Sequence, residues 1–142
     1  MTTGMQRSFS ARMPMLPSAL AWVEQCGAQQ GLNAEVLLRL ALIVEELFTN
    51  TVLHGHGGDH DALVSIALQV EAGQPTLHYG DRAPPFDPLR YLAESAPDLD
   101  APPEHRPIGR MGLPMVAQMA EQFDYAYTDG CNCIRLRLRR QP

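Results

Sequence analysis

Apolar residues recur with helical spacing in two early segments of the chain. Residues 17–31, PSALAWVEQCGAQQG, carry a proline in the first turn and end at a glycine, which is typical of a helix. After Asn33, a residue that caps helices well, residues 34–55 continue the helical pattern for about six turns and end at Gly55. The pattern therefore predicts two consecutive helices, the second of which is the longest in the chain.

Alternating apolar and polar positions predict strands before and after these helices. Residues 6–13 form a short opening strand, and residues 62–73 and 74–81 form two strands joined by a turn at Gly73. Two C-terminal strands lie on either side of the turn sequence TDGCN. In the last strand, aliphatic residues for a buried face alternate with arginines for a solvated face: Ile134, Leu136 and Leu138 with Arg135, Arg137 and Arg139.

The pattern breaks between these two groups of strands. Residues 82–107 contain seven prolines, which predicts a long loop with at most one helical turn at residues 89–93. Residues 112–123 then predict a helix with an apolar stripe. This order of elements favours an α+β fold, a two-layer sandwich with helices on one face of a mixed, mostly antiparallel sheet.

Composition narrows the classes of protein. A chain of 142 residues with 45% hydrophobic content predicts one domain, residues 1–142, with one core. The net charge of −5 argues against nucleic-acid binding, and without a membrane span or signal peptide we expect a cytoplasmic protein. The three cysteines have no C-x-x-C spacing, so we expect reduced thiols. All eleven basic residues are arginine, which excludes the lysine of a P-loop.

One ridge of the long helix carries polar groups. Glu46 and Asn50 are four residues apart, so their side chains stand one above the other, and His54 continues the row. Apolar residues flank this row, which suggests that it lines a cleft. A partly desolvated Glu46 is a candidate general base, and Asn50 offers an oxygen to Mg²⁺. The opposite stripe is expected to face the core: Leu37, Leu40, Ala41, Val44, Leu47 and Phe48.

Two other interpretations of this stretch stay open. Long helices also carry Glu and Asn at this spacing by chance, as an ordinary surface. The sequence HGHGGDHD places His54, His56 and His60 near two aspartates, which allows a zinc site. The absence of cysteines and the glycines between the histidines favour ordinary loop residues instead.

Three patches, EELFTNTVLHG, DRAPPFDP and RPIGRMGLPMV, occur in an order that resembles the GHKL, or histidine kinase-like, ATPase superfamily. The resemblance is strongest to bacterial anti-sigma-factor serine kinases of the RsbW type, and it covers nearly the whole chain. It implies a Bergerat-type ATP-binding fold that uses ATP and Mg²⁺. It also implies a homodimeric protein serine/threonine kinase. This kinase would phosphorylate a small STAS-type anti-sigma-factor antagonist and bind a sigma factor or similar regulator of transcription. Neither nucleic acid nor a membrane is expected as a partner.

The resemblance also implies roles for single residues. Glu46 matches the base that activates the attacking hydroxyl, Asn50 the Mg²⁺ ligand, and His54 the recurrent histidine at the end of this helix. Asp81 matches the aspartate that recognises the adenine amino group. The other ATP-binding positions implied are Ala83, Pro85, Gly109, Arg110, Met111, Gly112 and Leu113.

The last patch also has a physical reason to bind phosphate. Gly112 precedes a predicted helix with Pro114 in its first turn, so outward-facing backbone N–H groups offer an anion site. Arg106 and Arg110 flank this turn and are candidates to neutralise phosphate charge, and residues 93–107 would form a lid over the nucleotide.

Two positions differ from the usual pattern of this superfamily. Ala83 occupies the third position of the D-x-G-x-P box, where a positive φ would make a Cβ costly, and Arg110 occupies a position that is commonly glycine. An alternative hypothesis is therefore a non-catalytic ATP-binding module that sequesters a regulatory partner.

Overall fold

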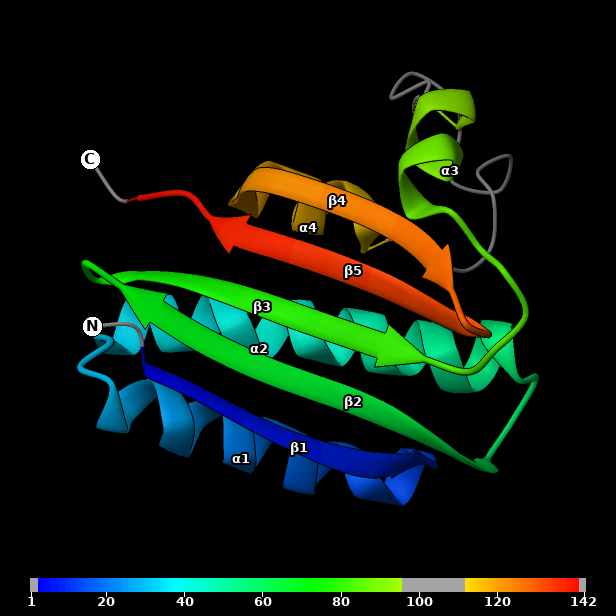
Figure 1. The fold of residues 1–142 in the computed structure, drawn as a ribbon, viewed down its shortest axis with the longest axis horizontal. Helices are drawn as coiled ribbons and strands as arrows, with labels where there is room; N and C mark the ends of the chain where they lie inside the picture. Colours follow the sequence, from blue (N-terminus) through cyan, green and yellow to red (C-terminus); the bar gives the residue numbers. More distant parts are fainter. Residues whose placement is uncertain (1–2, 96–111, 141–142) are drawn as a thin grey trace, which may run out of the picture.

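The protein is described by a computed structural model that covers residues 3–95 and 112–140. Five strands form one sheet in the order β1-β2-β3-β5-β4 (Figure 1). All four strand pairings within these residues are antiparallel, where the sequence predicted a mixed, mostly antiparallel sheet. The strands are β1 (Thr3–Ala11), β2 (His60–Glu71), β3 (Gln74–Asp81), β4 (Ala120–Thr128) and β5 (Cys131–Leu138).

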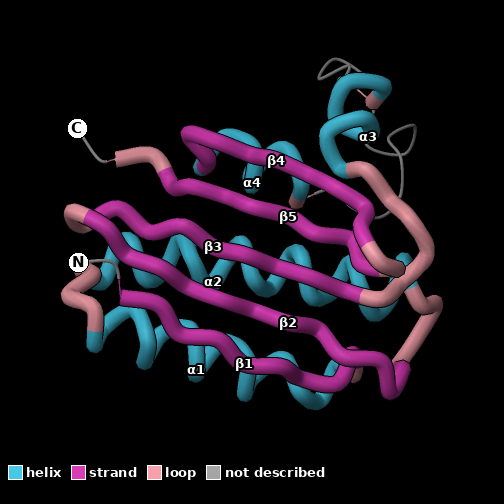
Figure 2. The backbone as a smooth tube through the Cα atoms, in the orientation of Figure 1, coloured by secondary structure: helices cyan, strands magenta, loops and turns pink. Residues whose placement is uncertain are grey.

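The helices cover one face of this sheet, which confirms the predicted two-layer α+β fold. Figure 2 shows α1, α2 and α4 behind the sheet, while α3 stands near the end of β4. A short 3₁₀ turn, η1, leads into α1, and a π-helical turn, η2, continues α2. The bounds are η1 (Met13–Met15), α1 (Leu16–Gln29), α2 (Ala34–Thr49), η2 (Asn50–Gly55), α3 (Pro88–Glu94) and α4 (Leu113–Met119).

The hydrophobic core lies between the sheet and the helices. Along β2, Val64, Ile66 and Leu68 are fully buried, as the period of two in a half-buried strand requires. The buried stripe of α2 is turned slightly from the predicted one, because Leu37 and Ala41 are only half-buried. The buried residues of α2 are Leu40, Ile43, Val44, Leu47 and Phe48.

The long helix begins where the sequence predicts. The Asn33 side chain accepts a hydrogen bond from the backbone N–H of Val36 at 3.0 Å, so the helix has a side-chain N-cap. It does not stay α-helical to its end, because residues Asn50–Gly55 widen into η2. The backbone N–H of His56 donates to the carbonyl of Thr51 at 2.9 Å, five residues earlier. Single π-helical turns of this kind are frequent at functional sites.

The opening strand, predicted at residues 6–13, is Thr3–Ala11, and two predicted helices also have different bounds in the structure. The helix predicted for residues 112–123 ends at Met119, and Ala120 is already extended and paired with Leu138 of β5. Ala120 is buried, so its apolar character suits a strand facing the core as well as a helix stripe. Helix α3 spans about two turns rather than one, because the Asp87 side chain caps its N-terminus.

The remaining predictions concern the cysteines, membrane-spanning helices and the lid. The three cysteines are free thiols, as predicted. In residues 3–95 and 112–140, no helix combines the length and the apolarity that a membrane crossing requires. Residues 96–107 of the predicted lid lie outside the described residues.

Candidate functional site

A cavity lies where α2 and η2 meet the end of β3 and the start of α4. Its wall includes four residues that the sequence singled out: Asn50, Asp81, Ala83 and Leu113. Apolar side chains, among them Leu47, Phe86 and Ile134, and several polar side chains complete the wall. An apolar cavity with a few convergent polar groups is the usual form of a small-molecule site.

Asn50, on the cavity wall, forms a hydrogen-bonded pair with Glu46, which is not itself part of that wall. Asn50 Nδ2 donates to Glu46 Oε1 at 3.0 Å, across one turn of the helix. Both side chains are half-buried. The Asn50 amide donates through Nδ2, so its Oδ1 can coordinate a cation. Glu46 has a second carboxylate oxygen, Oε2, that does not take part in this hydrogen bond. Mg²⁺ prefers such hard oxygens and commonly takes one or two from protein, so these residues fit a magnesium ion.

The same carboxylate lies against the glycine that precedes α4. A Cβ placed on Gly112 would lie 2.1 Å from Glu46 Oε2 and 2.3 Å from its carboxyl carbon. The φ of Gly112 is −81°, which any residue can adopt, so the need for glycine here is steric. Helix α4 packs against α2, and this packing brings the acid and the glycine turn together.

Also on the cavity wall, buried donors hold the Asp81 carboxylate. Oδ1 accepts from Asn132 Nδ2 at 2.9 Å and from the backbone N–H of Ala83 at 3.1 Å. Oδ2 accepts from Thr51 Oγ1 at 2.7 Å. A carboxylate offers about four acceptor positions, so these three bonds fix the group and leave room for one more donor.

Thr51 links Asp81 to a buried phenol. Tyr79 Oη lies 2.7 Å from Thr51 Oγ1. Burial raises the pKa of Tyr79 well above its ordinary value, so the phenol stays protonated and keeps a hydrogen to donate. Thr51 Oγ1 also lies 3.0 Å from the backbone carbonyl of Leu47, so its one hydrogen is shared between Leu47 and Asp81, while its oxygen can accept from Tyr79. Thr51, Tyr79 and Asn132 were not among the site residues predicted from the sequence, although Thr51 adjoins Asn50 and Tyr79 shares a strand face with Asp81.

The expected cost of Ala83 does not arise. Among the described residues other than glycine, a positive φ occurs only at Ala72 and Asp129, so Ala83 needs no strained backbone. Its side chain is buried and meets a glycine instead. A Cβ on Gly55 would lie 2.7 Å from the Ala83 Cβ, so the methyl group uses the space that Gly55 leaves.

Several predicted residues are not brought to the cavity wall. His54 is exposed on η2, and Pro85 is exposed and lies instead in an outer groove with Tyr91 and Tyr127. Gly109, Arg110 and Met111, like Arg106, lie outside the described residues.

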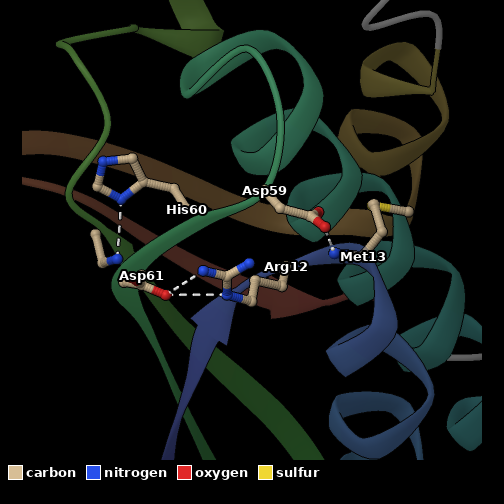
Figure 3. Close-up of polar contacts among 6 residues, drawn as sticks. Arg12, Met13, Asp59, His60 and Asp61 are labelled. Atoms are coloured by element: carbon tan, nitrogen blue, oxygen red, sulfur yellow. Dashed lines mark hydrogen bonds and ion pairs between the residues drawn. The ribbon is translucent and has the colours of Figure 1, made fainter.

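The histidine- and aspartate-rich stretch ties β2 to the beginning of the chain (Figure 3). Asp61 forms an ion pair with Arg12, which holds the pKa of Asp61 below its usual value, and Asp59 accepts from the backbone N–H of Met13 at 2.8 Å. His60 Nδ1 accepts from the N–H of Ala62 at 2.9 Å. Among the described residues, no three His, Cys, Asp or Glu side chains group as metal ligands would. The stretch thus joins the start of β2 to the segment that follows β1.

Comparison with known proteins agrees with this fold. Residues 9–138 match the family described as the histidine kinase-like ATPase domain, and the chain belongs to this family. The predicted membership of the histidine kinase-like ATPases is thereby confirmed, and ATP is the ligand that this family implies. No curated protein matches the chain.

A solved structure shares the fold. The crystal structure of the RsbU and RsbW domains of Rv1364c from Mycobacterium tuberculosis aligns with a TM-score of 0.65 at 15% sequence identity, and the alignment covers 96% of this chain and 32% of that one. The chain therefore corresponds to about a third of that structure, and at this identity the likeness concerns the fold alone.

Proposed function

We propose that this chain is a single-domain, cytoplasmic protein serine/threonine kinase that transfers the γ-phosphoryl group of ATP to a protein hydroxyl. The observation that carries the proposal is the position of Glu46. Its carboxylate is hydrogen-bonded to Asn50, which lines the same cavity as Asp81, and lies against Gly112. The proposed general base would thus lie beside the proposed cation ligand, and that ligand would share a cavity with the proposed acceptor for the adenine amino group.

The proposed chemistry follows from these positions. Asp81 would accept a hydrogen bond from the adenine amino group, and Gly112, with Gly109, would approach the phosphates. Asn50 would hold Mg²⁺ through Oδ1 and orient Glu46 through Nδ2. When bound, Mg²⁺ would neutralise phosphate charge, which supplies much of the catalysis in phosphoryl transfer. Glu46 would accept the proton of the serine or threonine hydroxyl as that oxygen bonds to the γ-phosphorus and the ADP oxygen leaves.

We further propose that the chain acts as an anti-sigma factor in a partner switch. Its substrate would be a small STAS-type antagonist, and its second partner a sigma factor or similar regulator, with the kinase acting as a homodimer. Family membership and the fold shared with a structure that contains an RsbW domain support this role.

The test is transfer of labelled γ-phosphate from ATP to a STAS-type protein encoded beside this chain. We expect transfer with Mg²⁺, its loss with a chelator, and its loss in Asn50→Ala. Binding of ATP without transfer would instead support the non-catalytic module that sequesters its partner. Undiminished transfer by Asn50→Ala would contradict the proposed mechanism.

A further inference from the structure

The loop that follows Asp81 lacks two backbone hydrogen-bond donors. It contains the consecutive prolines Pro84 and Pro85, which have no N–H to donate. The carbonyls of Ala83 and Pro84 accept instead from Asn132 Nδ2, at 3.0 and 3.1 Å. A side chain on β5 thus replaces the missing backbone donors of the loop.

Asn132 uses both ends of its amide in this way. Its Oδ1 accepts from the backbone N–H of Phe86 at 3.0 Å and from Tyr125 Oη at 2.6 Å. Its Nδ2 also lies 2.9 Å from Asp81 Oδ1, so its two hydrogens are shared among three acceptors, and Asn132 and Asp81 are directly paired across β5 and β3. Asn132 is only 4% exposed. Because donors and acceptors surround it, the amide can be accommodated in one orientation only, and it fixes both the loop and the carboxylate.

A fixed carboxylate matters for base recognition. Adenine presents an amino group as donor at the position where guanine presents a carbonyl oxygen. A rigid acceptor therefore favours adenine and repels guanine, and a site of this kind rejects a base that leaves its buried polar group unpaired. A carboxylate free to rotate, or to admit a water molecule, loses this discrimination.

We propose that Asn132 is a positioning residue that makes this site selective for adenine by fixing Asp81 and the loop of residues 83–86. The inference rests on the proposed nucleotide-binding function. It predicts that changes at Asn132 affect the contact with the base and spare the Glu46–Asn50 end, where the metal and phosphates would bind.

The test compares binding of ATP·Mg²⁺ and GTP·Mg²⁺ by calorimetry. For Asn132→Ala we expect ATP affinity to fall about tenfold while GTP affinity changes less than about twofold, so that the ATP:GTP ratio collapses. Tyr125→Phe removes one bond to Asn132 from a residue outside the cavity wall, and we expect a loss of about twofold to threefold in ATP affinity alone. Thr76→Val, a buried polar change on β3 that is also outside the cavity wall, is the matched control and leaves both affinities unchanged.

The outcomes separate the two proposals. A wild-type chain that binds neither nucleotide overturns the proposed function, and with it this inference. A wild type that prefers ATP, with a folded Asn132→Ala that keeps the same preference or weakens both nucleotides equally, overturns the inference alone. If Asn132→Ala does not fold, Tyr125→Phe decides, and an unchanged ATP:GTP ratio in that variant overturns the inference.

Discussion

The two carboxylates of the candidate site, Asp81 and Glu46, are held differently. Asp81 accepts from three donors that come from η2, β5 and its own loop, two of them buried side chains. Glu46 has one described hydrogen bond, to the next turn of its own helix, and a steric contact with Gly112. Asp81 is thus held by hydrogen bonds from three segments, while Glu46 has one hydrogen bond within its own helix and one steric contact with the turn before α4. Changes around Asp81 should therefore affect stability, and changes around Glu46 should affect the proposed reaction.

The largest expected effect is at Gly112, beside the Glu46 carboxylate. Gly112→Ala adds a Cβ where the Glu46 carboxylate lies, so the carboxylate must move. We expect phosphoryl transfer to slow about a hundredfold, because a misplacement of about 1 Å has that effect on catalysis. The melting temperature should change little, since a flexible side-chain end can move aside. In a Glu46→Gln background the same change should add no further loss, and independent, additive losses would contradict the contact.

Next to Asp81, Thr51→Val removes the hydroxyl between Tyr79 and Asp81. We expect the free energy of unfolding to fall by about 2 kcal/mol, because the buried Tyr79 phenol loses its partner. Adding Tyr79→Phe should recover part of this loss, since it removes the unpaired group. Urea unfolding of the three variants checks this, and a double variant less stable than Thr51→Val would be inconsistent with the proposed link.

A smaller effect is expected where the loop meets η2. Gly55→Ala places a methyl group 2.7 Å from the Ala83 Cβ, and we expect a loss of about 1–2 kcal/mol in the free energy of unfolding. Gly55 has no positive φ, so the loss is steric rather than conformational. The combination with Ala83→Gly should restore stability. Equal stability of Gly55→Ala and the combined variant would show that the two residues do not interact.

The smallest expected effect concerns pH. Burial is the main cause that lowers the pKa of His56 from its ordinary 6.5, and the adjacent His60 adds to it. The unfolded chain therefore binds more protons than the folded one just below pH 6.5, so stability falls as the pH decreases through that range. We expect His56→Gln to flatten this slope in urea titrations at several pH values. His78, whose pKa is also lowered, would keep part of the slope. A slope identical to that of the wild type would rule out His56 as a source.

The sequence predicted local features better than contacts between distant segments. The N-cap at Asn33 and the pairing of Glu46 with Asn50 depend on spacing within one helix, which periodicity reveals. The bonds from Asn132 depend on the register of β3 against β5, and no local pattern encodes a register between distant strands. The predicted C-terminal end of α4 was wrong because Ala120 suits either a helix or a strand.

The central claim, that the ridge of Glu46 and Asn50 performs phosphoryl transfer, has a direct test. The measurement is the rate of γ-phosphate transfer by Glu46→Gln, made beside its ATP affinity and beside Glu45→Gln, which alters the adjacent, exposed acid. The account predicts a loss of transfer of at least about a hundredfold in Glu46→Gln, with ATP affinity retained and with Glu45→Gln fully active. Transfer at the wild-type rate by Glu46→Gln would contradict it.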